Sequence, residues 1–296
     1  MDKSETLVQY ATYLADSGKS PHTLRAYTQD LANFAAWFEQ TTGEAFDPQA
    51  VNPRDITEYR GFLITRGRKP ATVNRRLVAL QRFYRWARRR GHVTDNPFDV
   101  LEGVHVKQQQ GVAPKWLDQK DQNALLRAVR RKRNSRDLAV VELMLRAGLR
   151  VSELAGLRLD DVEMGQRSGK VIVREGKGGK YREVPLSKEV RRALESYLEI
   201  REEDGSDRLF LGQRGPINAP GVQYVVGKYA YQARLEGVTP HTLRHTFGKN
   251  LVDAGVSLDQ VATLLGHESL DTVMVYTRPS QQDLEKAVRK AAGEIL

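Results

Sequence analysis

Apolar residues recur at helical spacing through most of the first hundred positions. After the helix-start signal Ser20-Pro21 they fall three or four residues apart, at Leu24, Tyr27, Leu31, Phe34 and Phe38. A second apolar stripe follows Pro53, and a third runs from about Ala71 to Arg90 before Gly91. The pattern therefore predicts an N-terminal domain built from helices.

The third of these helices has two contrasting faces. Its apolar face carries Val73, Leu77, Leu80, Tyr84 and Ala87, and its opposite face carries Arg75, Arg82, Arg85 and Arg89. The stretch 66–90 contains ten Lys or Arg residues and no Asp or Glu. A solvated helix face normally mixes both signs. The absence of acids favours contact with DNA phosphates over a basic face that only keeps the protein soluble.

The second half of the chain mixes helical and strand patterns. A stretch poor in large apolar residues, 103–114, predicts a linker between a helical DNA-binding domain at 1–102 and a second domain at 115–296. In the second domain two β-like runs, 170–174 and 181–186, flank a glycine-rich tip and predict a hairpin. The remaining patterns are helical, so a mixed α/β, mainly helical domain is expected. They cover 118–131, 136–147, 189–201, 221–235, the stretch from His241 onward and 281–292.

Composition narrows the possible functions. The chain has 296 residues and no cysteine, which excludes disulfides, thiolate metal sites and cysteine nucleophiles. No apolar run is long enough to span a membrane and no secretory signal is visible, so a soluble cytoplasmic protein without a membrane partner is expected. The formal net charge of +10 favours a polyanionic partner, in practice nucleic acid.

Two basic features stand out in the second domain. Arg150 follows Gly148 at a turn between helices, where a rigidly held guanidinium suits bidentate contact with phosphate oxygens. Taken alone, a surface arginine paired with a nearby glutamate is the more common explanation. Lys177 stands among the glycines of the hairpin tip, with Lys180 and Arg182 adding positive charge that could contact DNA. An exposed turn lysine is the plainer alternative.

Further candidates lie near the C-terminus. His241 and Arg244 are three residues apart and share a helix face. His267 follows Gly266, which is typical of a helix C-cap, and Tyr276 ends the helix that Ser269 can begin. Each of these residues alone is explained equally well by ordinary packing.

Taken together, these candidates supply the groups that phosphoryl transfer requires. Phosphoryl transfer on DNA needs cations to stabilise the charge of the transition state, a nucleophile, and a proton donor for the leaving oxygen. Two arginines, a lysine, two histidines and a tyrosine supply these roles without a metal ion or other cofactor. A zinc site on His241 and His245 is disfavoured because Thr242 stands where a metalloprotease needs glutamate. Nucleotide hydrolysis is rejected because no phosphate-binding loop is complete.

These residues resemble the tyrosine recombinase (phage integrase) family, and most closely its Xer-like members. The resemblance covers nearly the whole chain and rests on "AGLRVSEL", "GKGGKYREVPL", "HTLRHTF" and "LLGHESLDTVMVYT". It implies that Tyr276 attacks the scissile phosphate, giving a 3′-phosphotyrosyl link and a Holliday junction later in the reaction. It also implies that Arg150 and Arg244 hold the nonbridging oxygens. Lys177 would protonate the leaving 5′ oxygen, His241 would assist proton transfer at the tyrosine, and His267 would bond the phosphate.

The resemblance also implies an architecture. A helical core-binding (SAM-like) domain and the catalytic domain would form a C-shaped clamp on double-stranded DNA. Four copies would assemble on two duplexes, and a C-terminal helix, 281–292, would dock on a neighbouring subunit or on its own domain. A partner recombinase or accessory protein could be required.

Several alternatives stay open at this stage. Arg278 stands where Xer proteins usually have histidine soon after the nucleophile, and 248–250 departs from the usual pattern after "HTF". A mobile-element integrase therefore fits as well as an enzyme that resolves chromosome or plasmid dimers. A basic DNA-binding protein without catalysis and a type IB topoisomerase are the competing functions.

Overall fold

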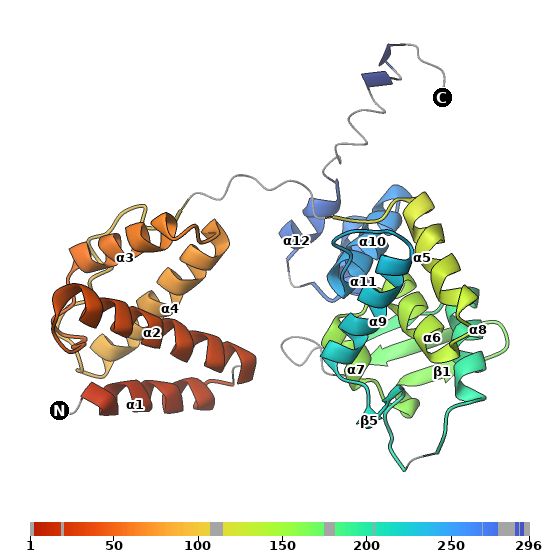
Figure 1. Cartoon of the computed structure of the whole chain (residues 1–296), viewed down its shortest axis with the longest axis horizontal. Coiled ribbons are helices and arrows are strands. Elements are labelled where there is room, and N and C mark those ends of the chain that lie inside the picture. The colour runs from red at the N-terminus through yellow and green to blue at the C-terminus, as the bar shows by residue number, and fades with distance from the viewer. Residues whose placement is uncertain are drawn as a thin grey trace. The chain divides into compact units, whose positions relative to one another are not determined.

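The computed structural model divides the chain into two compact units, Met1–Gly111 and Val112–Leu296 (Figure 1). It describes residues 3–18, 21–106, 115–174, 181–203, 205–267 and 269–277, and near the C-terminus 288–289 and 291–292. None of the described helices is long and apolar enough to cross a membrane.

The described part of the first unit is helical, as the periodicity predicts. Its helices are α1 (Lys3–Asp16), α2 (Pro21–Thr42), α3 (Pro53–Thr65) and α4 (Pro70–Arg89). Asn52 caps α3 by accepting hydrogen bonds from the backbone N–H groups of Arg54 and Asp55, and Pro53 occupies the first helical position. The expected apolar face of α4 is fully buried, and aromatic rings from α1, α2 and α3 complete this core.

The segment after α4 remains attached to the first unit. Asn74 donates to the carbonyl oxygen of Val106 at 2.9 Å and accepts from its backbone N–H at 2.8 Å. Val104 and Val106 also pack against the first core. The first unit therefore extends past the boundary expected at residue 102, and the rest of the expected linker, 107–114, lies outside the described residues.

The second unit is mainly helical around a small antiparallel sheet. In order, its described elements are α5 (Gln119–Arg131), α6 (Ser135–Arg146), α7 (Val151–Gly156), η1 (Leu159–Asp161), β1 (Val162–Met164), β2 (Gly169–Val173), β3 (Arg182–Pro185), α8 (Lys188–Leu198), β4 (Leu211–Gly212), β5 (Gly215–Pro216), α9 (Ala219–Gln232), α10 (Pro240–Asp253), α11 (Leu258–Leu265), α12 (Asp271–Met274) and η2 (Val275–Thr277). Most of the expected docking helix, 281–292, lies outside the described residues.

The predicted hairpin forms β2 and β3 of a three-stranded sheet whose order is β1-β2-β3. Its last described pair before the tip joins Val173 to Arg182. The tip itself, 175–180, lies outside the described residues. The short strands β1, β4 and β5 were not predicted, because two or three residues are too few to show an alternating pattern.

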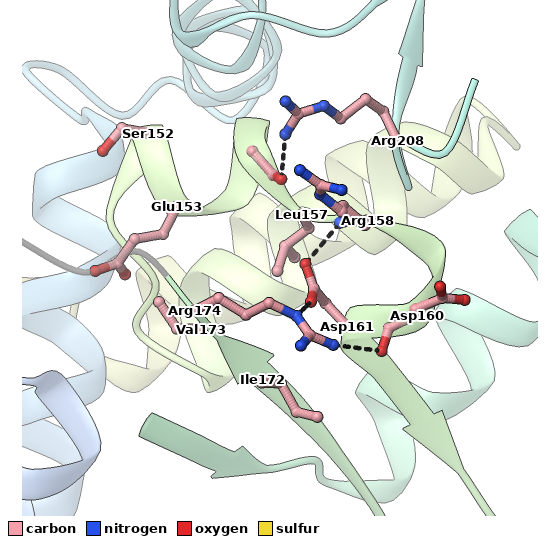
Figure 2. Close-up of a pocket in the computed structure, with 11 residues that line it drawn as sticks. Ser152, Glu153, Leu157, Arg158, Asp160, Asp161, Ile172, Val173, Arg174 and Arg208 are labelled. Atoms are coloured by element: carbon pink, nitrogen blue, oxygen red, sulfur yellow. Dashed lines mark hydrogen bonds and ion pairs between the residues drawn. The ribbon is translucent and has the colours of Figure 1, made fainter. Parts of the chain in front are cut away.

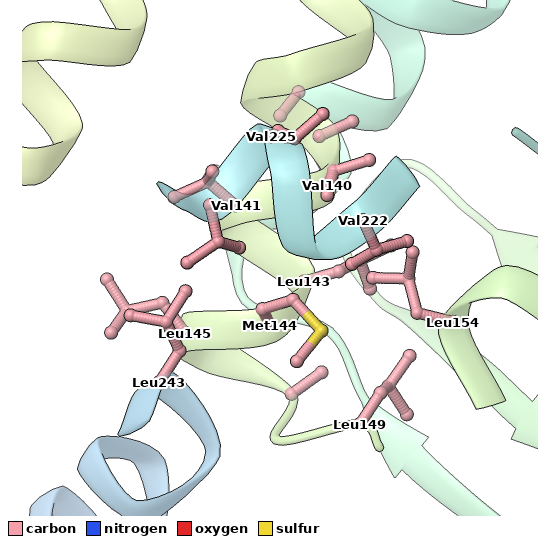
Figure 3. Packing of buried hydrophobic residues seen from close by; sticks show 14 of the residues in the cluster. Val140, Val141, Leu143, Met144, Leu145, Leu149, Leu154, Val222, Val225 and Leu243 are labelled. Atoms are coloured by element: carbon pink, nitrogen blue, oxygen red, sulfur yellow. The ribbon is translucent and has the colours of Figure 1, made fainter. Parts of the chain in front are cut away.

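Helix α6 lies at the centre of the second core. Val140, Leu143 and Met144 of this helix belong to one buried cluster with Val222 and Val225 of α9 (Figure 3). All five side chains are at most 2% exposed. Close packing of this kind fixes the end of α6, and with it the turn that leads into α7.

Candidate active site

The end of α11 gathers three arginines. The helix stops at Gly266, which adopts the left-handed conformation with φ 63°. The last carbonyl groups of a helix have no intrahelical partner and carry partial negative charge. Three successive carbonyl oxygens accept from arginines: Leu264 from Arg182 Nε at 3.0 Å, Leu265 from Arg244 Nη2 at 2.5 Å, and Gly266 from Arg150 Nη2 at 2.8 Å.

Arg150 is the N-cap residue of α7, and Glu153 of the same helix holds it. The carboxylate of Glu153 accepts from the Arg150 backbone N–H at 2.8 Å and from its Nη1 at 2.6 Å. It also accepts from Nη1 and Nη2 of Arg182, at 3.0 and 2.7 Å. Burial by itself would raise the pKa of Glu153, but the two arginines outweigh it and lower that pKa to about 2.

From the sequence alone, Glu153 is expected only as the partner of a surface arginine. The side chain is 2% exposed and joins two guanidinium groups. A glutamate three positions after the residue that precedes a helix is the capping-box pattern, and this was the available signal.

Arg244 is buried, with 2% exposure, and it stabilises the turn before Arg150 by a hydrogen bond. Its Nη1 donates to the carbonyl oxygen of Gly148 at 2.6 Å. A Cβ at Gly148, whose φ is 60°, would lie 2.3 Å from the Phe247 ring, so only glycine permits this approach of the turn to α10. Burial and the charge of Arg150 lower the pKa of Arg244 to about 10, which leaves it protonated at neutral pH.

Tyr276 lies in η2 with 1% exposure. Its hydroxyl is 3.0 Å from Nδ1 of His245 on α10. Burial raises the pKa of Tyr276, and the charges of Arg244 and Arg150 act against that rise. The tyrosine therefore keeps its proton at neutral pH in this arrangement.

Three histidines surround the arginines and the tyrosine. Nε2 of His267 lies 3.2 Å from Nη2 of Arg244, and the ring of His241 lies 4.2 Å from that of His245. Burial and nearby positive charges lower the pKa of all three, to about 4 for His245 and for His267. Each imidazole is therefore neutral at pH 7 and has one ring nitrogen able to accept a proton.

The structure brings together most of the residues expected from the sequence. Arg150, Arg244, His267 and Tyr276 lie around the end of α11 and the facing side of α10, with His241 beside them. His245 is the histidine at the tyrosine hydroxyl, whereas the sequence alone indicates it only as a disfavoured metal ligand. Lys177 lies outside the described residues, as does Lys180.

The expectation that Arg182 contacts DNA is wrong. The residue is 8% exposed, and its Nε and both terminal nitrogens donate to acceptors inside the protein. Strand alternation explains the error. Arg182 and Val184 point to the buried face of β3, whereas Glu183 points outward.

The basic face of α4 is exposed at all four expected positions. Arg75 is ion-paired with Asp30, which is 3% exposed, so part of its charge is already neutralised. The guanidinium of Arg82 lies over the Tyr27 ring, and Arg85 and Arg89 have no acidic partner among the described residues. A hollow beside this face is lined by basic and aromatic side chains, namely Arg82, Arg85, Arg89, Arg90, Tyr13 and Trp86.

A separate pocket between α7, η1 and β2 is also rich in arginine (Figure 2). Its charges are balanced: Arg174 Nε lies 2.5 Å from Asp161, and Arg158 Nη1 lies 3.1 Å from Asp207. Arg208 donates to the carbonyl oxygen of Gly156 at 2.5 Å. This pocket stabilises the loop after α7, and among the described site residues Glu153 alone lines it. Among the described residues no group of three His, Cys, Asp or Glu side chains could hold a metal ion.

Comparison with protein families identifies the chain. Residues 115–283 match the phage integrase family, and residues 7–91 match the phage integrase N-terminal SAM-like domain. The chain belongs to the phage integrase family. This family member is 36% identical to the tyrosine recombinase XerC of Pelobacter propionicus over 277 residues, which are 92% of this chain and 89% of the relative. It is 32% identical to the tyrosine recombinase XerA of Thermococcus kodakarensis over 293 residues, 98% and 96% of the two chains.

Solved structures agree with the fold. The Tn1549 transposon integrase in complex with circular intermediate DNA superposes with a TM-score of 0.72 at 21% identity, covering 96% of this chain and 98% of that one. The site-specific recombinase XerH bound to palindromic difH substrate gives a TM-score of 0.72 at 22% identity, covering 90% of this chain and 79% of that one. The expected resemblance to Xer-like tyrosine recombinases, the fold class and the expectation of a site-specific recombination enzyme are confirmed.

Proposed function

We propose that this phage integrase family member cuts and rejoins double-stranded DNA at a specific site through a covalent link to Tyr276. The observation that carries the proposal is the convergence of Arg150, Arg244 and His267 on the end of α11. Each guanidinium keeps N–H donors that no described acceptor uses. A phosphate held there would meet fixed positive charge in a largely buried site, where electrostatic stabilisation of a transition state is strongest.

The resemblance to tyrosine recombinases assigns a chemical role to these residues and to Lys177, which lies outside the described residues. The tyrosine oxygen attacks phosphorus and the bond from phosphorus to the 5′ oxygen breaks, leaving a 3′-phosphotyrosyl link and a free 5′ hydroxyl. Arg150 and Arg244 stabilise the charge on the nonbridging oxygens, and His267 donates a further hydrogen bond. Lys177 gives its proton to the 5′ oxygen. Reversal by a 5′ hydroxyl from another strand rejoins the DNA without a cofactor.

Tyr276 must first leave its present position, since a 1% exposed side chain cannot reach a phosphate. His245 holds the hydroxyl before this movement. We assign the transfer of the tyrosine proton to His241, which is exposed and next to His245. Its lowered pKa keeps it neutral and able to accept that proton.

Duplex DNA is the proposed partner of both units, with the basic face of α4 contacting phosphates. The assembly of four copies on two duplexes, the covalent phosphotyrosine and action on chromosomal DNA in the cytoplasm belong to the same proposal. The relatives named recombinase or integrase support it. A non-catalytic DNA-binding function has no observation in its favour, because the described members of the catalytic set are all present.

A covalent-trapping assay tests the proposal. The full-length protein is mixed in EDTA with nicked DNA carrying candidate sites from its own replicon, and the products are separated on a denaturing gel. We expect a protein–DNA adduct in the wild type that Tyr276→Phe abolishes while DNA binding persists. Tight binding without an adduct on any site, with host extract added, would support the non-catalytic alternative. Relaxation of any supercoiled plasmid without site preference would support a topoisomerase.

A further inference from the structure

Arg182 is a buried cation that the chemistry above does not use. It is the first residue of β3, and its register partner Val173 ends β2 at the base of the hairpin. Its side chain is 7% exposed. Burying a guanidinium is costly unless its charge and its N–H donors find partners.

The partners of Arg182 connect two parts of the site. Nη1 and Nη2 hold both oxygens of Glu153, the carboxylate that also binds Arg150. Nε, on the other edge of the guanidinium, donates to the carbonyl oxygen of Leu264. One planar group therefore fixes the distance between α7 and the end of α11, where Arg244 and Arg150 are also bound.

We propose that Arg182 is a positioning residue, which sets the guanidinium of Arg150 for the scissile phosphate through Glu153 and α11. The inference rests on the proposed function, because it assigns to Arg150 a role at that phosphate. Arg182 does not touch the DNA. It acts by giving Glu153 a single orientation, so that the carboxylate presents one oxygen to the Arg150 side chain and the other to its backbone N–H.

Lysine at position 182 could not reproduce this arrangement of hydrogen bonds. A guanidinium presents its donors in a fixed fork that matches a carboxylate, whereas an ammonium acts as a point charge. In Arg182, Nη1 and Nη2 form this fork toward the Glu153 carboxylate, and Nε donates to the carbonyl oxygen of Leu264. A lysine could hold one of the two partners and keep the charge, but it could not set the spacing between them.

Gly266 shows how closely α11 approaches Arg182. A Cβ at this position would lie 2.9 Å from Nη1 of Arg182 and 3.1 Å from its Cδ. The helix end therefore needs glycine for its left-handed φ and also for this contact. Gly266→Ala would push the Arg182 side chain away without changing any charge in the site.

The test measures the rate of the chemical step on two substrates. Single-turnover adduct formation and DNA affinity are compared for the wild type, Arg182→Lys and Gly266→Ala, below their unfolding temperatures. On ordinary DNA we expect both variants to cleave ~10- to 100-fold more slowly, by analogy with the range found for side chains that orient metal ligands through hydrogen bonds, with little change in Kd. Arg174→Lys is the matched control, because Arg174 directly follows β2 and its hydrogen bonds within the described part of the chain go to Asp161 and to the Asp160 carbonyl oxygen.

The second substrate carries a methylphosphonate at the scissile position. Replacing a nonbridging oxygen by methyl removes one negative charge, so the reaction depends less on Arg150. On this substrate the cleavage rates of Arg182→Lys and Gly266→Ala should lie closer to the wild-type rate, and so should that of Arg150→Ala. A purely structural defect would persist unchanged on both substrates.

Each outcome is informative. No adduct from the wild type would overturn the proposed function itself. A cleaving wild type together with an Arg182→Lys variant of equal rate would overturn only the positioning role. The positioning role would also be overturned if the loss of cleavage rate were the same on the methylphosphonate substrate, or if weaker DNA binding accounted for the whole loss of rate.

Discussion

The hydroxyl of Tyr276 lies 3.0 Å from Nδ1 of His245, and the Tyr276 ring packs against Gly248, about one turn further along α10. The nucleophile is therefore kept away from solvent by a histidine at its polar end and a glycine beneath its ring. Both residues come from α10, the helix that also supplies Arg244. The position of the tyrosine is thus tied to the helix that holds the phosphate-binding arginine.

Gly248→Ala should displace Tyr276. A methyl group there would lie 2.7 Å from two ring carbons, closer than side chains tolerate, and the ring is the group free to move. The protein is labelled with fluorotyrosine, and the Tyr276 signal in ¹⁹F NMR is assigned with Tyr276→Phe. We expect the chemical shift of this signal to move toward the value of a solvent-exposed fluorotyrosine. We also expect lower stability, although alanine is the better helix former.

Gly227→Ala provides the control for this substitution. Gly227 is also within a helix, but a Cβ there would meet nothing within 4 Å. The replacement should therefore stabilise the protein by ~0.5–1 kcal/mol and leave the Tyr276 signal in place. An unshifted signal in Gly248→Ala would mean that α10 moves rather than the tyrosine.

Local sequence patterns predict part of this site well. The two faces of α4 follow from its periodicity, and Gly266 as a C-cap follows from one residue. The three-arginine arrangement does not, because Arg150 and the carbonyl of Gly266 are 116 residues apart. Alternation with Val184 puts Arg182 on the buried face of β3, but no local pattern identifies its partner as a glutamate 29 residues earlier.

The choice between His241 and His245 illustrates the same limit. Residues four apart share one helix face, so the sequence places both histidines toward the site. Which of them meets Tyr276 depends on how η2 packs on α10, and that packing is set by the small core containing Phe247 and Val273.

Stability should fall as the pH drops from about 6.5 to about 4. The pKa values of His245 and His267 are about 4 in the folded protein, below the usual 6.5. In this window the unfolded chain binds protons that the folded chain does not, so lowering the pH favours unfolding. Calorimetric unfolding at steps across this range measures the slope. His245→Gln should reduce it, and an unchanged slope would mean that His245 titrates normally.

Glu153→Gln should destabilise the protein and slow cleavage. The amide keeps the shape of the side chain but leaves Arg150 and Arg182 without their shared negative charge. Removing one partner of a buried ion pair typically costs about 3–5 kcal/mol. Glu58→Gln is the control, because its pair with Arg54 is exposed on α3 and should contribute at most about 0.5 kcal/mol. Thermal unfolding and the covalent-trapping assay measure the two effects; equal stability of both variants would contradict the bridging role.

Replacing Arg82, Arg85 and Arg89 together with alanine should flatten the salt dependence of DNA binding. Each phosphate contact adds about 0.9 to the slope of log K against log salt, so losing three should lower its magnitude by roughly 2–3. Arg75 is left unchanged, because its pair with buried Asp30 makes it part of the fold. Fluorescence anisotropy across a range of salt concentrations measures the slope, and Arg54→Ala on α3 is the control for charge removal elsewhere. An unchanged slope in the triple variant would place the basic face of α4 away from DNA and move the phosphate contacts to other surfaces of the chain.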